Sequence, residues 1–218
     1  MRAAVLALIC GCALAACNPT APSNESVSGG GLFPDLTRTA YRAEANLFNQ
    51  DGETIPVVMI RDGRKMRMEY NAADEGAATI IANGDTGESF VITTQGGRAM
   101  AIRASGLDQG LTDPADAWQG ELSESATRTG TCSVAGESGA EWTKTTAEDG
   151  TDMVCVTDDG IILRATDDGR VVWETTQVQR GAQSADLFVL PPGVQAMDLG
   201  NMGALMNEAI EAAKQRGN

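Results

Sequence analysis

The chain has 218 residues, a length that suits one large β domain or two small ones, and its 16 Lys and Arg against 30 Asp and Glu give a formal net charge of −14. It contains no histidine, which excludes Ser-His and Cys-His nucleophilic catalysis and any His-ligated metal. The acidic balance argues against nucleic-acid binding, because phosphate contacts require clustered Lys and Arg.

The N-terminus has the form of a secretory signal. Arg2 precedes an apolar run over residues 3–16, which is too short for a transmembrane helix. The run ends in LAAC at residues 14–17, which resembles the lipobox of bacterial lipoproteins. The resemblance implies that residues 1–16 are a signal peptide, that signal peptidase II cuts before Cys17, and that Cys17 carries a diacylglyceryl anchor. The alternative is an ordinary secretory signal with a cysteine near its cleavage site.

The residues after Cys17 bear on the membrane and on the tether. Asn18 follows the cysteine, whereas an Asp there favours inner-membrane retention in enterobacterial lipoproteins. The resemblance therefore implies a periplasm-facing protein in the outer membrane rather than the inner one. Residues 18–31, NPTAPSNESVSGGG, are polar and rich in Ser, Gly and Pro. Residues 17–31 are thus expected to be a lipidated cysteine and a flexible tether that spans on the order of 20 Å.

Cysteine usage fits export. Cys10 and Cys12 lie in the signal and Cys17 is the anchor, which leaves Cys132 and Cys155. Two cysteines in an oxidising periplasm are expected to form one disulfide. A reduced pair that bound a metal would need further ligands, and the chain has no histidine to supply them. We therefore predict a Cys132–Cys155 disulfide and no metal site.

Residues 32–218 are predicted to form a single antiparallel β domain. Short runs of alternating apolar and polar residues, such as residues 41–47, 65–70 and 171–176, lie between Asp-Gly or Asn-Gly pairs. These pairs supply the positive φ values of type I′ hairpins, so the pattern predicts a meander with one apolar face. The pairs are Asp51-Gly52, Asp62-Gly63, Asn83-Gly84, Asp149-Gly150, Asp159-Gly160 and Asp168-Gly169, with Gly96-Gly97 as a weaker signal.

Two helical segments accompany the strands. Asp113 and Pro114 have the form of an N-cap and a proline at the first helical position, so a short helical segment is expected to begin there and include Trp118. Because a sheet must cover its apolar face, we expect a mainly β fold, a curved antiparallel sheet or half-open barrel closed by these two segments. The second segment is a C-terminal helix predicted from one apolar stripe, formed by Leu205, Met206, Ala209, Ile210 and Ala213.

The combination of lipobox, tether, about ten antiparallel strands and a disulfide resembles the half-barrel of the lipoprotein-localisation proteins LolA and LolB and related periplasmic domains. The segments that carry the resemblance are residues 63–70 (GRKMRMEY), 155–161 (CVTDDGI) and 188–193 (FVLPPG). The resemblance implies a concave apolar face that holds acyl chains. The chain has no clear counterpart of the protruding apolar loop of LolB, so transfer of lipoproteins is not implied.

The candidate ligand-binding residues are Met, aromatic and aliphatic side chains expected on the concave face, because such side chains adapt to irregular apolar guests. The alternative is that the same side chains form the packed core of the domain. They are Met66, Met68, Tyr70, Phe90, Ile92 and Trp173.

A cluster of cations surrounds the predicted hairpin at residues 62–63. Arg61, Arg64, Lys65 and Arg67 either contact an anionic headgroup or acidic partner, or form an ordinary solvated charged surface. The aspartates at residues 158–159 and 167–168 fit turn chemistry better than a calcium site.

The sequence contains no nucleophile elbow, Ser-x-x-Lys pair, phosphate-binding loop or dinucleotide fingerprint. We therefore expect no catalytic residues and no cofactor. The prediction is a non-enzymatic, membrane-anchored periplasmic lipoprotein that binds an apolar or amphiphilic, lipid-like ligand on the concave face of its sheet. The alternative is a structural or interaction domain with a filled core that docks an envelope protein.

Overall fold

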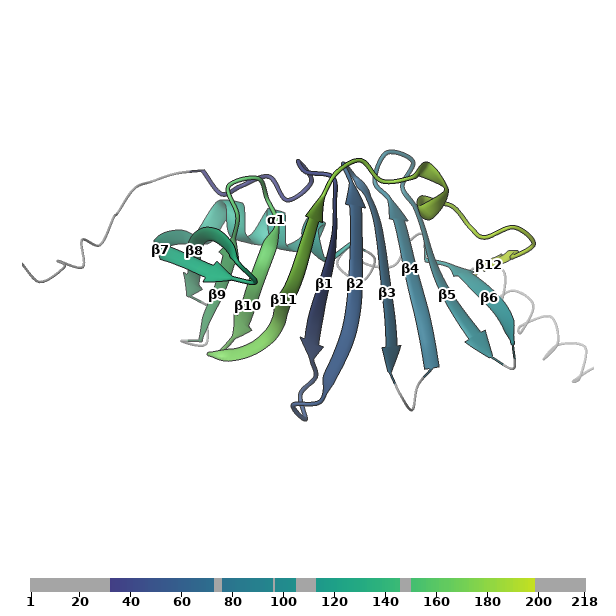
Figure 1. The fold of residues 1–218 in the computed structure, drawn as a ribbon, viewed down its shortest axis with the longest axis horizontal. Helices are drawn as coiled ribbons and strands as arrows, with labels where there is room; N and C mark the ends of the chain where they lie inside the picture. The colour runs from purple at the N-terminus through teal and green to yellow at the C-terminus, as the bar shows by residue number, and fades with distance from the viewer. Residues whose placement is uncertain (1–31, 73–75, 96, 105–112, 146–149, 199–218) are drawn as a thin grey trace, which may run out of the picture.

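The computed structural model describes residues 32–72, 76–95, 97–104, 113–145 and 150–198. These residues form one open, curved sheet of 12 strands in the order β12-β6-β5-β4-β3-β2-β1-β11-β10-β9-β8-β7 (Figure 1). The predicted β fold with a curved, open sheet is confirmed.

The sheet consists of two antiparallel meanders joined along one seam, where β1 pairs with β11. The short β12 (Ala196–Asp198) runs parallel to β6, so the sheet is mixed, which the sequence did not indicate. The first meander contains β1 (Tyr41–Phe48), β2 (Thr54–Asp62), β3 (Lys65–Ala72), β4 (Gly76–Asn83), β5 (Glu88–Gln95) and β6 (Arg98–Arg103). The second contains β7 (Thr127–Val134), β8 (Glu137–Thr145), β9 (Thr151–Val156), β10 (Ile162–Asp167) and β11 (Arg170–Arg180).

The two-residue hairpins follow the predicted turn chemistry only in part. Between β10 and β11, Asp168 and Gly169 both have positive φ, as a type I′ turn requires. Between β2 and β3 the loop is Gly63-Arg64 rather than Asp62-Gly63, and only the glycine has positive φ. Ala135-Gly136 forms a further turn with two positive φ values, and it was not predicted because it is neither an Asp-Gly nor an Asn-Gly pair.

The remaining turn pairs fall elsewhere. The pairs at residues 51–52, 83–84 and 159–160 lie in loops longer than two residues. The Gly96-Gly97 and Asp149-Gly150 pairs each include a residue outside the described chain. Asp-Gly and Asn-Gly pairs therefore located most strand ends but not the loop lengths.

The helix α1 (Pro114–Ser125) connects β6 at one side of the sheet to β7 at the far edge. Asp113 is its N-cap, and its side chain accepts a hydrogen bond from the Ala115 N–H, which confirms the predicted start. The helix continues well beyond Trp118, and it lies behind the strands of the second meander in Figure 1. No described helix has the length and apolarity needed to cross a bilayer. The predicted C-terminal helix lies in residues 199–218, outside the described residues.

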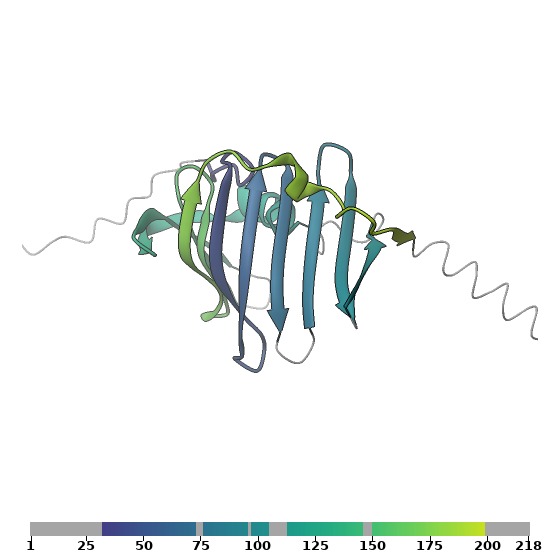
Figure 2. The ribbon, with the colours of Figure 1, turned by 45° about the vertical axis from the view of Figure 1, so that its right-hand side comes forward.

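The sheet buries apolar side chains on both of its faces. We call the face against which α1 packs the inner face and the opposite one the outer face. The N-terminal segment contributes to the main core on the inner face, where Phe33 meets Trp142 edge-on with ring centroids 5.2 Å apart. The segment after β11 runs along the upper ends of the first strands to the 3-10 helix η2 (Ala185–Phe188) and on to β12 (Figures 1 and 2).

The sheet curls tightly at its β7 edge, where the predicted Cys132–Cys155 disulfide is present. Cys132 lies on β7 and Cys155 on β9, which flank β8. Their Cα atoms are 6.0 Å apart, whereas strands two positions apart in a flat sheet are separated by about 9.5 Å. Gly139 on β8 permits this curl, since a Cβ there would lie 2.5 Å from the Val156 carbonyl oxygen.

Candidate functional site

The strand register separates the six predicted ligand-binding residues onto two faces. Met68 pairs with Ile80 on β4, and Ile80 pairs with Val91 on β5, so these three side chains share the inner face. Phe90 and Ile92 flank Val91 and therefore point to the outer face. The prediction that Phe90 and Ile92 line the ligand face is wrong, because β5 carries apolar residues on both of its faces.

The outer face has its own apolar cluster, which explains Phe90 and Ile92. Ile92 packs with Ile81 and Ala101 beneath Leu190 and neighbouring residues of the segment that follows β11. The Arg103 guanidinium lies over the ring of Phe90, 4.9 Å from its centroid. These two positions are structural, and alternation in the sequence hid them because a strand that is covered on both sides reads as a continuous apolar run.

A cavity of about 100 Å³ lies on the inner face between the N-terminal half of α1 and the sheet. Of the predicted ligand-binding residues, Met68 and Trp173 line it, whereas Met66 is fully buried in the main core and Tyr70 is half-buried beside that core. The apolar lining includes Leu47, Met59, Met68, Ala115, Trp118 and Trp173.

A buried ion pair closes one side of this cavity. Arg61 on β2 is 0% exposed, and its Nη2 donates to Asp113 Oδ1 at 2.5 Å. Burial disfavours the charged guanidinium, but the Asp113 carboxylate and the Tyr41 hydroxyl more than offset this effect and raise the pKa of Arg61. Burial likewise raises the pKa of Tyr41. Arg61 Nε has no hydrogen-bond partner among the residues that the structure describes.

The predicted cation cluster around residues 62–63 is divided between the two faces. Arg61 is neither a headgroup contact nor a solvated charge, because it is buried against the N-cap of α1. Arg67 lies on the outer face, where it pairs with Glu69 at 2.6 Å and donates to the Leu187 carbonyl oxygen at 3.2 Å. Both readings of the cluster are therefore wrong for Arg61. Arg67 pairs across the strands with Ile60, the neighbour of Arg61, so the two arginines point to opposite faces.

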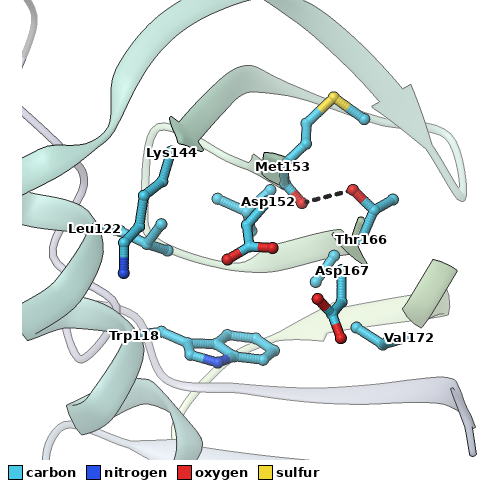
Figure 3. Close-up of a pocket in the computed structure, with 10 residues that line it drawn as sticks. Trp118, Leu122, Lys144, Asp152, Met153, Thr166, Asp167 and Val172 are labelled. Atoms are coloured by element: carbon cyan, nitrogen blue, oxygen red, sulfur yellow. Dashed lines mark hydrogen bonds between the residues drawn. The ribbon is translucent and has the colours of Figure 1, made fainter. Parts of the chain in front are cut away.

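A second cavity, of about 210 Å³, lies beneath the C-terminal half of α1. Trp118 lines both cavities, and Leu122 covers the second one against β8, β9, β10 and β11. Its charged lining residues are Lys144, Asp152 and Asp167. In Figure 3 the carboxylates of Asp152 and Asp167 point into the space above the Trp118 indole, and the Lys144 side chain lies on the side of Leu122.

Three carboxylates gather at the mouth of this second cavity. One oxygen from each of Asp152, Asp167 and Asp168 lies within 4.8 Å of the others. Asp152 Oδ1 is buried without a hydrogen-bond partner in the described part of the chain. Burial, together with the neighbouring Asp167 carboxylate, raises the pKa of Asp152. Asp152 was not predicted as a site residue, although it alternates on β9 with the inward-facing Val154 and Val156 and therefore places a carboxyl on the apolar face.

The two cavities can accommodate the apolar part of a small ligand, with charged groups near its ends. Each is smaller than the roughly 300 Å³ at which typical small-molecule pockets begin. A long chain is therefore larger than either cavity, and Trp118 is the residue that lines both of them.

Comparisons with known proteins give similarity in fold. No protein-family model and no curated protein matches the chain. An uncharacterised conserved protein from Thermus thermophilus superposes with a TM-score of 0.51 at 11% identity, over 74% of this chain and 91% of that one. The MucA/MucB complex of Pseudomonas aeruginosa gives a TM-score of 0.48 at 13% identity, covering 74% of this chain and 59% of that chain. PNGF-II superposes with a TM-score of 0.45 at 14% identity, over 73% of this chain and 31% of the PNGF-II chain. At this identity the likeness to the Thermus protein concerns the fold alone.

Proposed function

We propose that the protein is a non-enzymatic lipoprotein of the bacterial envelope, anchored through Cys17 and facing the periplasm, that binds the apolar part of a lipid-like ligand on its inner face. The observation that supports this most is the apolar cavity of about 100 Å³ beneath α1, lined by Met68, Trp118 and Trp173. Burial of apolar ligand surface there favours binding by about 25 cal/mol per Å² before ordering costs.

In this proposal α1 acts as the cover of the ligand site. Its N-cap Asp113 is tied to Arg61, and its Gln119 side chain accepts a hydrogen bond from the Leu36 N–H at 2.8 Å. Trp118 lies between these two attachments and faces both cavities. An entering chain would displace Trp118 and α1 together, and the cover would close again over the bound apolar group.

The proposed role is binding rather than catalysis. The titratable residues that line the first cavity are Tyr41 and Arg61, and the Arg61 guanidinium is already paired with Asp113. Catalysis by a nucleophile would require a base within hydrogen-bonding reach, and the chain has no histidine to serve as one.

Native mass spectrometry tests ligand binding directly. A chain that begins at residue 18 retains every described residue, and after soaking in bacterial lipid extract it should keep bound lipid. Ala115→Leu should abolish binding because the added atoms fill the cavity, whereas Ala99→Leu, at an exposed position on β6, should not. Circular dichroism would verify that both variants are folded. A clean apo mass for the parent chain despite excess lipid would contradict the proposal.

The second candidate function is that of an interaction domain that docks an envelope protein. It is favoured by how completely the inner face is packed, since Met66 is 0% and Trp173 is 7% exposed. Both residues were predicted to bind ligand and belong to the main core, although Trp173 also lines the first cavity. A clean apo mass in the experiment above would favour this candidate.

The proposed anchor has a separate test. Cys17→Ser should abolish labelling by a radioactive or alkyne-tagged fatty acid and leave the precursor uncut, because the thiol is the acceptor of the diacylglyceryl group. Cys12→Ser, in the same signal, is the matched control and should label normally. Continued labelling of Cys17→Ser would show that the chain does not use this cysteine as its anchor.

A further inference from the structure

The second cavity differs from the first in the charge of its lining. Trp118, Leu122 and Val172 give it an apolar interior, while Asp152 and Asp167 project into it from β9 and β10. The first cavity has a buried cation that is already neutralised by Asp113. The second therefore combines apolar surface with a net negative charge.

The charges around the second cavity leave an excess of carboxylates. Lys144 is the one cation among the described residues that line it, against Asp152 and Asp167. Asp168 adds a third carboxylate within 4.8 Å, although one of its oxygens accepts from the Thr151 N–H. The nearby Arg170 donates to the Gln50 carbonyl oxygen. A cation at the cavity mouth would therefore be attracted.

The hydrogen-bonding state of Asp152 points in the same direction. The half-buried Asp152 carboxylate accepts a hydrogen bond from the Asp168 backbone N–H, but its Oδ1 atom is buried and has no partner among the described residues, so this oxygen has an unmet capacity to accept. Leaving a buried acceptor unpaired is unfavourable, and a charged donor is the strongest partner that a carboxylate can take. Figure 3 shows this carboxylate on the same side of the cavity as that of Asp167, facing the Trp118 ring.

We propose that this cavity binds an amphiphile with a primary ammonium group, whose alkyl chain lies against Trp118 and Leu122 and whose ammonium donates to Asp152 and Asp167. An ammonium has three donors on one nitrogen, which suits several carboxylates converging on a small volume. A hydrated divalent cation would satisfy the carboxylates but gain nothing from the apolar interior. This inference rests on the proposed function and specifies the headgroup of its ligand.

The test compares three ligands with the same chain length and different headgroups. Decylammonium, decanol and decanoate are titrated calorimetrically, below their aggregation concentrations, into the chain from residue 18 onward. Decylammonium should bind about tenfold more tightly than decanol, the effect of one partly buried charge-assisted hydrogen bond. Decanoate should bind more weakly than decanol because the carboxylates repel it.

Isosteric variants locate the headgroup. Asp152→Asn and Asp167→Asn should each reduce the preference for decylammonium over decanol while decanol affinity stays constant. Lys144→Gln should raise the affinity for decylammonium, since it removes the opposing charge from the lining. Asp186→Asn, an exposed carboxylate in η2 on the outer face, is the matched control and should change neither affinity.

The outcomes distinguish this inference from the proposed function. If none of the three ligands binds, the inference about the headgroup fails, and the proposed function fails with it only if the lipid extract also leaves a clean apo mass. Equal binding of decylammonium and decanol would overturn only the inference about the headgroup, as would a preference that survives both aspartate variants. Calcium binding that depends on Asp152 and Asp167, without any preference for decylammonium, would also overturn it and assign the carboxylates to a metal ion.

Discussion

Arg61 lies with 0% exposure beneath α1, and its guanidinium is held by the Asp113 carboxylate at 2.5 Å. The same carboxylate caps the helix by accepting from the Ala115 N–H at 3.0 Å. One side chain therefore neutralises a buried charge and begins the helix that covers the inner face. Because both partners are almost fully buried, removing one leaves an unpaired charge in the interior.

We expect Arg61→Met to destabilise the fold by about 3 kcal/mol, because it leaves the Asp113 carboxylate without its cation. The double variant with Asp113→Asn should recover part of this loss, since Asn is also a good N-cap. Urea unfolding measures both. Arg42→Met is the control. The Arg42 Nη2 atom lies 3.7 Å from Glu44 Oε1 in a solvent-exposed ion pair, and exposed ion pairs contribute less than about 1 kcal/mol to stability. An equal loss in both single variants would contradict the special role of Arg61.

A second ion pair makes stability depend on pH. Arg180 Nε donates to Asp159 Oδ2 at 2.7 Å, and this interaction, with a hydrogen bond from Thr157, lowers the pKa of Asp159 from 3.8 to about 2. A lowered pKa means that the pair stabilises the fold above pH 4 and that this contribution is lost as the pH falls toward 2. The side chain is 34% exposed, so solvent screening limits the contribution to about 1 kcal/mol.

Asp159→Asn should therefore be less stable than the parent chain at pH 6, by about 1 kcal/mol, and most of this difference should disappear as the pH falls to about 2. The measurement is urea unfolding across this range, with the difference between the two chains plotted against pH. Asp158→Asn, an exposed neighbour, is the control and should give a small difference at every pH. A difference that persists unchanged at pH 2 would show that Asp159 acts through something other than its charge.

At the scale of elements, the N-terminal segment is fixed by the loop between β9 and β10. Thr39 Oγ1 donates to the Asp159 carbonyl oxygen at 2.7 Å. Gly160 has a φ of 89°, and a Cβ there would lie 2.0 Å from the Asp35 carbonyl oxygen. The segment can therefore pass close to the loop only because residue 160 has no side chain. This contact places Leu36 in the main core.

Gly160→Ala combines two costs, the left-handed backbone and the clash with Asp35. Gly169→Ala is the matched control, because Gly169 also has positive φ, 75°, but open space around its Cβ position. Placing alanine in the left-handed backbone conformation costs about 1 kcal/mol. Gly169→Ala should therefore lower the free energy of unfolding by about that much, and Gly160→Ala should lower it clearly more. Thermal unfolding and limited proteolysis near residue 36 would measure the effect. Equal losses would mean that the segment shifts freely away from the loop.

The strand pattern was predictable because period-two alternation and turn pairs are local signals. Which face each residue of β5 serves was not, because that requires knowing that the segment after β11 covers the outer face with Leu190. The burial of Arg61 also depends on a partner 52 residues away. The acidic cavity joins Trp118 on α1 to Asp152 on β9, and no local pattern connects them. Met68 and Trp173 were thus predictable from the sequence as residues of the inner face, whereas the positions of Arg61 and Asp167 beneath α1 were not.

At the scale of the whole molecule, two meanders share one seam between β1 and β11, and α1 packs against the second meander while its N-cap is tied to Arg61 on β2 of the first. In the second meander, the Cys132–Cys155 disulfide joins β7 to β9 across β8. The main core nonetheless extends from Met59 in the first meander to Trp142 in the second. Because the two halves share this core, we expect them to unfold together rather than in separate steps.

The disulfide should stabilise the whole molecule rather than its own meander alone. Its cysteines are 23 residues apart in sequence, and closing a loop of that length restricts the unfolded chain by about 3 kcal/mol on the chain-entropy account. The double variant Cys132→Ser with Cys155→Ser should therefore lower stability by about this amount, while tryptophan fluorescence and far-ultraviolet circular dichroism still report one common transition. All three tryptophans lie in α1, β8 and β11, so fluorescence follows the second half of the chain and dichroism follows the entire sheet. If the fluorescence transition of the double variant preceded its dichroism transition, the β7–β9 region would be unfolding alone. The seam between β1 and β11 would then not couple the two meanders.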